Sequence, residues 1–209
     1  KGFAIGSAAL TAMALVAAYI EEVKLWLGRL ADESAEGFKQ IGDVLFYKSH
    51  VPVSIPEGMT AVNVNAAHIK DFVAAYDLSV FNPLMLGGIF IGAMMAFLFS
   101  SLSMKAVGRA AGKMVDEVRR QFREITGIME GTGKPDYARC VEISTKGAQR
   151  EMMFPSLIAI AVPLIIGLTL GVAGVVGLLV GGMTAGFTLA SMLNNSGGAW
   201  DNAKKFIEK

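Results

Sequence analysis

The sequence predicts an all-α protein, a polytopic transmembrane helix bundle with about four spanning helices, one of which extends into the cytoplasm. Hydrophobic residues make up 53% of the 209 residues and charged residues only 18%, and the mean hydropathy is +0.50. The charges are confined to blocks between long uncharged runs. Since about 20 apolar residues are enough to cross the hydrocarbon layer, we expect a multi-pass integral membrane protein.

The first two spans are expected at residues 2–20 and 80–104. Both runs are uncharged, and the second is 25 residues long. Glu21 and Glu22 are expected to end the first helix. Small residues recur every four positions in both runs, and this spacing is typical of helices that pack closely in lipid. We therefore expect the first helix to be packed internally, and Gly88, Gly92, Ala96 and Ser100 to form another small-residue stripe on the second.

The last two spans are expected at residues 152–171 and 175–200. The uncharged run from Met152 to Trp200 is 49 residues long, which is about right for two crossings joined by a tight turn. Glycines crowd its middle, so we place the reversal between Leu170 and Val175.

The segments between the spans differ in charge. Residues 21–79 hold five Lys and Arg, whereas the connection 105–151 holds ten. The positive-inside rule therefore places 105–151 in the cytoplasm and 21–79 outside. A helical pattern continues from the second span to about Ile125, followed by a glycine-rich break and a short charged helix. In the outer segment we expect short extended stretches at 44–47 and 51–55 and a surface helix at 63–76.

The domain organisation is expected to be a single transmembrane domain covering residues 1–209. The sequence begins with Lys1 rather than Met, and an apolar run follows immediately. We therefore expect a part of a longer subunit.

The candidate functional site lies at the end of the last span. Asp201, Lys204 and Lys205 are three and four residues apart, which places them on one side of a helix. One interpretation is an acid and two snorkelling lysines that mark the membrane edge. The other is an anion site, in which the lysines bind phosphate and the carboxylate acts through Mg²⁺. Polar residues precede this end, and within a membrane span they usually face a cavity or a partner.

Other motifs in the sequence do not predict a functional site. The stretch around Gly133 and Lys134 lacks the first glycine and the Ser or Thr of a phosphate-binding loop. His50 and His68 have no ligand partner at metal-binding spacing, and the single Cys140 cannot form an internal disulfide. The formal net charge of +1 argues against nucleic-acid binding.

Three stretches of the sequence have the form of family signatures. The clearest is Ser196-Gly197-Gly198-Ala199-Trp200-Asp201-Asn202-Ala203-Lys204-Lys205. The others are Lys1 to Leu10 and the connection that contains Glu117-Val118-Arg119-Arg120-Gln121-Phe122 and Lys134-Pro135-Asp136-Tyr137. All three resemble motifs of the ion-translocating membrane-bound inorganic pyrophosphatases, and the likeness covers almost the whole chain, in order.

The resemblance implies the C-terminal part of a homodimeric pump subunit that hydrolyses cytoplasmic pyrophosphate and transports Na⁺ or H⁺. It implies Asp201 as a Mg²⁺ ligand, Lys204 as a phosphate contact, and Asn202 and Lys205 nearby. Ser7 and Leu15 would lie beside the ion path. K⁺ is a second candidate cofactor. The resemblance assigns no catalytic residue to this chain, so the rest of the subunit would supply the catalytic groups.

A rival interpretation is a non-enzymatic secondary transporter or channel segment. In that case the stretch from Asn194 to Lys205 would bind an anionic solute. Mg²⁺-dependent release of phosphate from pyrophosphate would distinguish the two.

Overall fold

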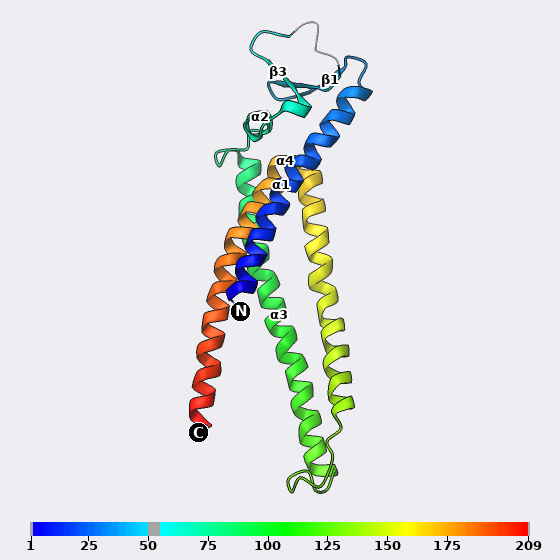
Figure 1. The fold of residues 1–209 in the computed structure, drawn as a ribbon, viewed down its shortest axis with the longest axis vertical. Helices are drawn as coiled ribbons and strands as arrows, with labels where there is room; N and C mark the ends of the chain where they lie inside the picture. The colour runs from blue at the N-terminus through cyan, green and yellow to red at the C-terminus, as the bar shows by residue number, and fades with distance from the viewer. Residues whose placement is uncertain (1, 50–54, 209) are drawn as a thin grey trace. The chain divides into compact units, whose positions relative to one another are not determined.

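The computed structural model describes residues 2–49 and 55–208, and long helices dominate it (Figure 1). Three helices, α1, α3 and α4, are long and apolar enough to cross a membrane, which confirms the expected all-α membrane bundle. The elements in chain order are α1 (Gly2–Glu33), β1 (Phe38–Ile41), β2 (Val44–Tyr47), β3 (Thr60–Asn63), η1 (Val64–Ala66), α2 (Ile69–Ala75), α3 (Pro83–Glu124) and α4 (Tyr137–Ile207).

The chain divides into two compact units. Unit 1 comprises Lys1–Ala96 and Ile165–Lys209, and unit 2 comprises Phe97–Leu164. Unit 1 therefore contains α1, the strands, α2, the start of α3 and the end of α4. Unit 2 contains the rest of α3, the loop after it and the start of α4.

A reversal at Gly171 divides α4 into two helical rods. Gly171 has φ 64° and ψ −159°, a conformation that is essentially restricted to glycine. The chain doubles back here, because a Cβ on Gly167 would lie only 3.5 Å from Val175 Cγ2, whereas eight residues of straight helix span about 12 Å. The turn falls within the expected 170–175 stretch, and the second rod runs from there to the C-terminal end (Figure 1).

Glycines bring the backbones of α3 and the second rod of α4 into direct contact within unit 1. A Cβ on Gly92 would lie 2.1 Å from the Leu178 carbonyl oxygen, and a Cβ on Gly181 would lie 2.1 Å from that of Ile89. Gly88 makes a similar approach to the backbone of α4. Gly88 and Gly92, two members of the expected small-residue stripe, therefore lie at a helix contact, and each glycine is required by the space available.

Helix α1 differs from its prediction in two ways. It does not end at Glu21 and Glu22 but continues to Glu33, because Leu27 and Ala31 are buried near its far end. Leu27 belongs to the core formed with the strands and α2, so burial outweighs the local charge. The expected close packing of residues 2–20 is not seen, since no residue of this stretch is buried among the described parts of the chain.

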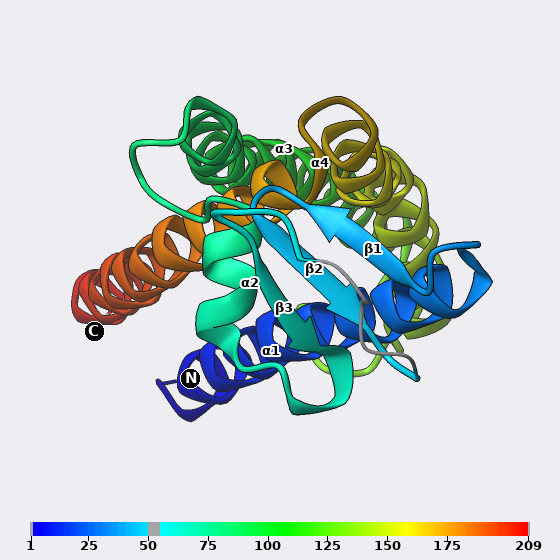
Figure 2. The ribbon, with the colours of Figure 1, turned by 90° about the horizontal axis from the view of Figure 1, so that it is seen from above.

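The outer segment folds into a small sheet with its own core. Strand β2 pairs antiparallel with β1 and parallel with β3, and Figure 2 shows α2 beside these strands. Phe46 is fully buried on β2 and its ring stacks on that of Phe72 from α2, with 5.3 Å between the ring centroids. The expected strand at 44–47 is confirmed. Of the expected stretch at 51–55, only Ile55 is described, and it lies outside the strands.

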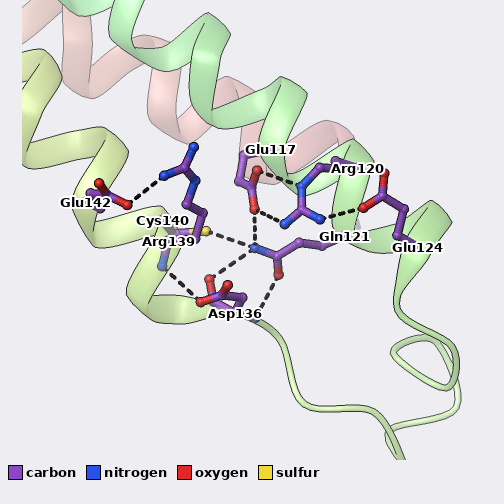
Figure 3. Close-up of polar contacts among 8 residues, drawn as sticks. All are labelled: Glu117, Arg120, Gln121, Glu124, Asp136, Arg139, Cys140 and Glu142. Carbon is purple, nitrogen blue, oxygen red and sulfur yellow. Dashed lines mark hydrogen bonds and ion pairs between the residues drawn. The ribbon is translucent and has the colours of Figure 1, made fainter.

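A buried amide joins the two helices of unit 2 near the loop between them (Figure 3). Gln121 on α3 is 4% exposed. Its Nε2 donates to the Asp136 carbonyl at 3.0 Å, and its Oε1 accepts from the Asp136 N–H at 2.9 Å. The side chain therefore pairs with both backbone groups of Asp136. The Asp136 carboxylate in turn accepts from the Arg139 N–H at 2.9 Å and caps the start of α4.

An ion pair adjoins this amide. Glu117 is 7% exposed and accepts from Arg120 Nη2 at 2.7 Å and from Gln121 Nε2 at 2.8 Å. These hydrogen bonds, with Arg120 contributing most, lower the pKa of Glu117 to about 2 in spite of its burial. Glu117 is therefore ionised throughout the physiological pH range. Arg120 also binds Glu124, so its guanidinium is paired with two carboxylates.

The glycine contact predicts a specific loss of stability. In the purified membrane protein, Gly92→Ala should cost about 1–3 kcal/mol, because the new methyl group has no room beside the Leu178 carbonyl. The midpoint of thermal unfolding in detergent should fall by several degrees. Gly108→Ala is the matched control, since nothing lies within 4 Å of its Cβ position. Equal midpoints for the two variants would contradict this packing.

The Gln121 pairing predicts a local effect. Gln121→Ala should release the loop before α4 at a cost of roughly 1–3 kcal/mol, because both backbone groups of Asp136 lose their partner. Limited digestion with endoproteinase Glu-C should then cut after the exposed Glu130 about tenfold faster. Gln149→Ala removes an exposed glutamine from α4 of the same unit and should leave the rate unchanged. Equal rates for both variants would show that Gln121 does not hold the loop.

Candidate anion site

The polar residues at the end of α4 form a stripe along one side of the helix. At 100° per residue, Asn194, Asp201, Lys204, Lys205 and Glu208 fall within roughly a third of the helix circumference. All of them belong to the last turns of α4 or directly follow it. We call this set the terminal stripe. The helical spacing expected from the sequence is therefore present.

Two ion pairs organise the terminal stripe. Lys205 Nζ lies 2.6 Å from Asp201 Oδ2, and Lys204 Nζ lies 3.5 Å from Glu208 Oε1. All four side chains are more than half exposed. Exposed pairs four residues apart on a helix stabilise it by only about 0.3–0.5 kcal/mol each. Both pairs are therefore weak enough for a stronger ligand to separate.

The location of the stripe suits a site open to the aqueous phase. In unit 1 it lies at the end opposite the sheet and α2, beyond the start of α1 (Figure 1). Gly197 and Gly198 precede Asp201, and nothing occupies the space beside either of them. The two lysines lie in the last turn of α4, where the negative end of the helix dipole favours cations. An anion at this end would be held by the ammonium groups and not by the helix.

The carboxylate of Asp201 fits a Mg²⁺ site only as one ligand among several. Its Oδ2 atom is engaged with Lys205, and no hydrogen bond to Oδ1 is present among the described residues. No group of three or more His, Cys, Asp or Glu residues that could hold a metal occurs in the described part of the chain. Mg²⁺ usually binds through one or two carboxylates together with phosphate oxygens and water. The single carboxylate agrees with that pattern.

Asn202 and the two candidate ion-path residues remain apart from these pairs. Asn202 is exposed on the flank of the stripe. Ser7 Oγ donates to the Ala4 carbonyl on its own helix at 3.1 Å, and Leu15 is 63% exposed. An apolar groove of about 380 Å³ does run between α1 and α4 in unit 1, but its lining includes neither residue. It is lined by Ala4, Ile5, Ala8, Ala9, Ala12, Gly182, Met183, Gly186, Phe187 and Ala190.

Glu208 is a residue of the terminal stripe that was not predicted from the sequence. It pairs with Lys204 across one helical turn, and the spacing of four from a lysine already assigned to the site was the available signal. The pairing of Gln121 with the backbone of Asp136 was also missed. Nothing in the local pattern indicates it, because the two residues are 15 positions apart.

The comparisons with known proteins agree over the full length of the chain. The family model described as inorganic H⁺ pyrophosphatase matches residues 1–209. A Bacteroides thetaiotaomicron protein named "Putative K(+)-stimulated pyrophosphate-energized sodium pump" is 56% identical over 209 residues, which are all of this chain and 26% of that protein.

Two further relatives carry the names of different pumps. A Caldanaerobacter subterraneus "K(+)-insensitive pyrophosphate-energized proton pump" is 45% identical over 208 residues, all of this chain and 24% of the relative. A Thermotoga maritima "K(+)-stimulated pyrophosphate-energized sodium pump" is 38% identical over 208 residues, all of this chain and 23% of the relative. The chain spans about a quarter of the length of these relatives, and it belongs to the inorganic H⁺ pyrophosphatase family.

Proposed function

We propose that the protein containing this chain is a pyrophosphate-energised primary ion pump that hydrolyses pyrophosphate and couples this reaction to transport of Na⁺ or H⁺. The observation that carries the proposal is the match to the pyrophosphatase family over all 209 residues. The relatives at 56% and 45% identity are named for pyrophosphate-driven transport of sodium and protons, respectively. The exposed cations of the terminal stripe support the same conclusion, since they suit a small, highly charged anion.

Lys204 and Lys205 would neutralise the charge of pyrophosphate. Phosphoryl transfer spreads negative charge over the phosphate oxygens, so positive groups that are already in place stabilise the transition state. Lys204 would contact a phosphate oxygen directly, and Lys205 would orient Asp201 or share the anion with Lys204. Asn202 would add an amide donor at the edge of the site. Water activation is left to groups outside this chain.

Because the ion pairs of the stripe are weak, pyrophosphate could easily replace the carboxylate partners of the two lysines. Because each exposed pair contributes only about 0.3–0.5 kcal/mol, separating Lys204 from Glu208 costs little when a phosphate oxygen replaces the carboxylate. The same holds for Lys205 and Asp201. The free protein would thus keep its site charges satisfied without opposing substrate binding.

Asp201 would serve as one Mg²⁺ ligand. When bound, Mg²⁺ neutralises phosphate charge and holds the substrate oxygens in position. Asp201 would contribute one carboxylate, while pyrophosphate, water and residues outside this chain would complete the ligand set. K⁺ is a second candidate cofactor, and two relatives are named as K⁺-stimulated.

The orientation proposed for the whole protein follows from the distribution of Lys and Arg, and the proposed assembly follows from the family resemblance. With ten Lys and Arg between the second and third spans, residues 105–151 would face the cytoplasm, and so would the terminal stripe after two further crossings. Ser7 and Leu15 would lie beside the ion path on α1. The complete subunit would form a homodimer in the lipid bilayer.

A direct test uses sealed vesicles that contain the complete protein. Pyrophosphate with Mg²⁺ should release phosphate and drive ion uptake, and repeating the assay with and without Na⁺ identifies the transported ion. A secondary transporter or channel segment that binds an anionic solute would release no phosphate. Phosphate release without ion uptake would agree with pyrophosphate hydrolysis but would contradict ion pumping.

Substitutions in the terminal stripe should separate the roles of its residues. In the complete protein, Lys204→Ala should lower kcat/KM for pyrophosphate about a hundredfold, because a charge that opposes the phosphoryl group is lost. Asp201→Asn should instead move half-activation to higher Mg²⁺ concentration. Lys134→Ala removes an exposed lysine from unit 2 and serves as the control. Unchanged hydrolysis in both site variants would remove these residues from the site.

A further inference from the structure

A second groove lies in unit 2, between α3 and the first rod of α4. Its volume is about 420 Å³, which is in the range of small-ligand sites. Small side chains form most of its walls, and Gly147 lies against Ala110, with 3.5 Å between a Cβ built on Gly147 and that of Ala110. The lining residues are Ser103, Ala106, Val107, Ala110, Ala111, Met114, Ser144, Gly147, Ala148, Glu151 and Met152.

Three cations surround the single carboxylate that lines this groove. Arg109 donates to Glu151 through Nε at 2.9 Å and also through Nη2, which leaves the N–H groups of Nη1 available. The hydrogen bond from Arg109 lowers the pKa of Glu151, and the positive charges of Lys113 and Arg150 lower it further. Lys113 and Arg150 make no hydrogen bond or ion pair within the described chain, so this end of the groove carries a net charge of about +2.

The position of the groove along the helices matches the headgroup layer of a membrane. The uncharged run of α3 ends at Met104, and that of α4 begins at Met152. The groove residues on α3 (103–114) and on α4 (144–152) lie at and just beyond these boundaries. Its apolar walls therefore start where the hydrocarbon ends, and its cations lie at the depth of phosphate groups.

We propose that this groove binds one anionic phospholipid of the leaflet on this side of the membrane. The headgroup phosphate is held by Arg109, Lys113 and Arg150, while the upper part of an acyl chain lies along Ala106 and Val107, on the membrane side of these cations. Basic pockets between transmembrane helices are a known form of lipid headgroup site. Glu151 fixes the direction of the Arg109 guanidinium and does not compete with the phosphate, because its oxygens are already engaged.

Two observations favour a lipid over a soluble anion. Most of the groove surface is apolar, and a free phosphate would leave that surface without a partner. Ser103, at the membrane end of the groove, has a buried hydroxyl oxygen without a hydrogen-bond partner within the described chain. An ester oxygen of a phospholipid lies just below its phosphate and would supply an acceptor at this depth.

Spin-labelled lipid tests the proposal in the complete protein. The protein is reconstituted into phosphatidylcholine vesicles that contain either spin-labelled phosphatidylglycerol or spin-labelled phosphatidylcholine, and the motionally restricted fraction is measured. The native protein should immobilise the anionic lipid in preference to the neutral one. In Lys113→Gln/Arg150→Gln this preference should fall about tenfold, since two cations beside the phosphate are removed.

Two further variants distinguish a specific lipid site from nonspecific attraction of anionic lipid to positive charge. Arg119→Gln/Arg123→Gln removes the same charge from exposed positions of α3 outside the groove lining and should keep the preference. Ala111→Leu retains every cation but fills the groove from its exposed side, and it should reduce the immobilised fraction. Equal losses in the two double variants, or full immobilisation by Ala111→Leu, would overturn the proposal. Competition by soluble glycerophosphoglycerol at equal strength would reassign the site to a free phosphate ester.

Discussion

The close backbone approach of α3 and the second rod of α4 is the constraint on which the candidate site depends. Gly92 and Gly181 lie where any side chain would collide with a carbonyl oxygen of the facing helix. The reversal at Gly171 returns the chain to that contact and directs the second rod toward the end of unit 1 opposite the sheet. In a membrane, apolar helices gain no hydrophobic energy by associating, so such contact depends on van der Waals packing between helix surfaces of complementary shape. The terminal stripe is thus carried on a rod whose position is fixed by glycine.

The terminal stripe, in contrast, does not depend on close packing. Its side chains are exposed, and its two ion pairs are weak. A rigid rod with loosely paired charges at its end suits a site that must exchange internal partners for a charged ligand. In the proposed function, Lys204 and Lys205 would neutralise the substrate and Asp201 would supply part of a metal site. They do not account for water activation, in agreement with a chain that spans about a quarter of its relatives.

Much of this arrangement follows from the sequence, because periodic and local patterns determine it. The spans, the glycine turn and the spacing of Asp201, Lys204 and Lys205 can be read from residues a few positions apart. The continuation of α1 to Glu33 was not predicted, because its cause is burial of Leu27 against strands that are distant in the sequence. The pairing of Gln121 with Asp136 is similarly non-local, and no periodicity indicates it. The identities of the substrate and the metal were inferred from the family resemblance, not from residue spacing.

Protection of a single thiol tests the central claim most directly. In the complete protein with its other cysteines replaced, Glu208→Cys places a thiol on the terminal stripe one turn beyond Lys204. A membrane-impermeant maleimide should label it from the cytoplasmic side, and Mg²⁺ with a non-hydrolysable pyrophosphate analogue should slow the labelling severalfold. Labelling only from the outer side, or labelling that the analogue leaves unchanged, would show that this end of α4 does not face pyrophosphate.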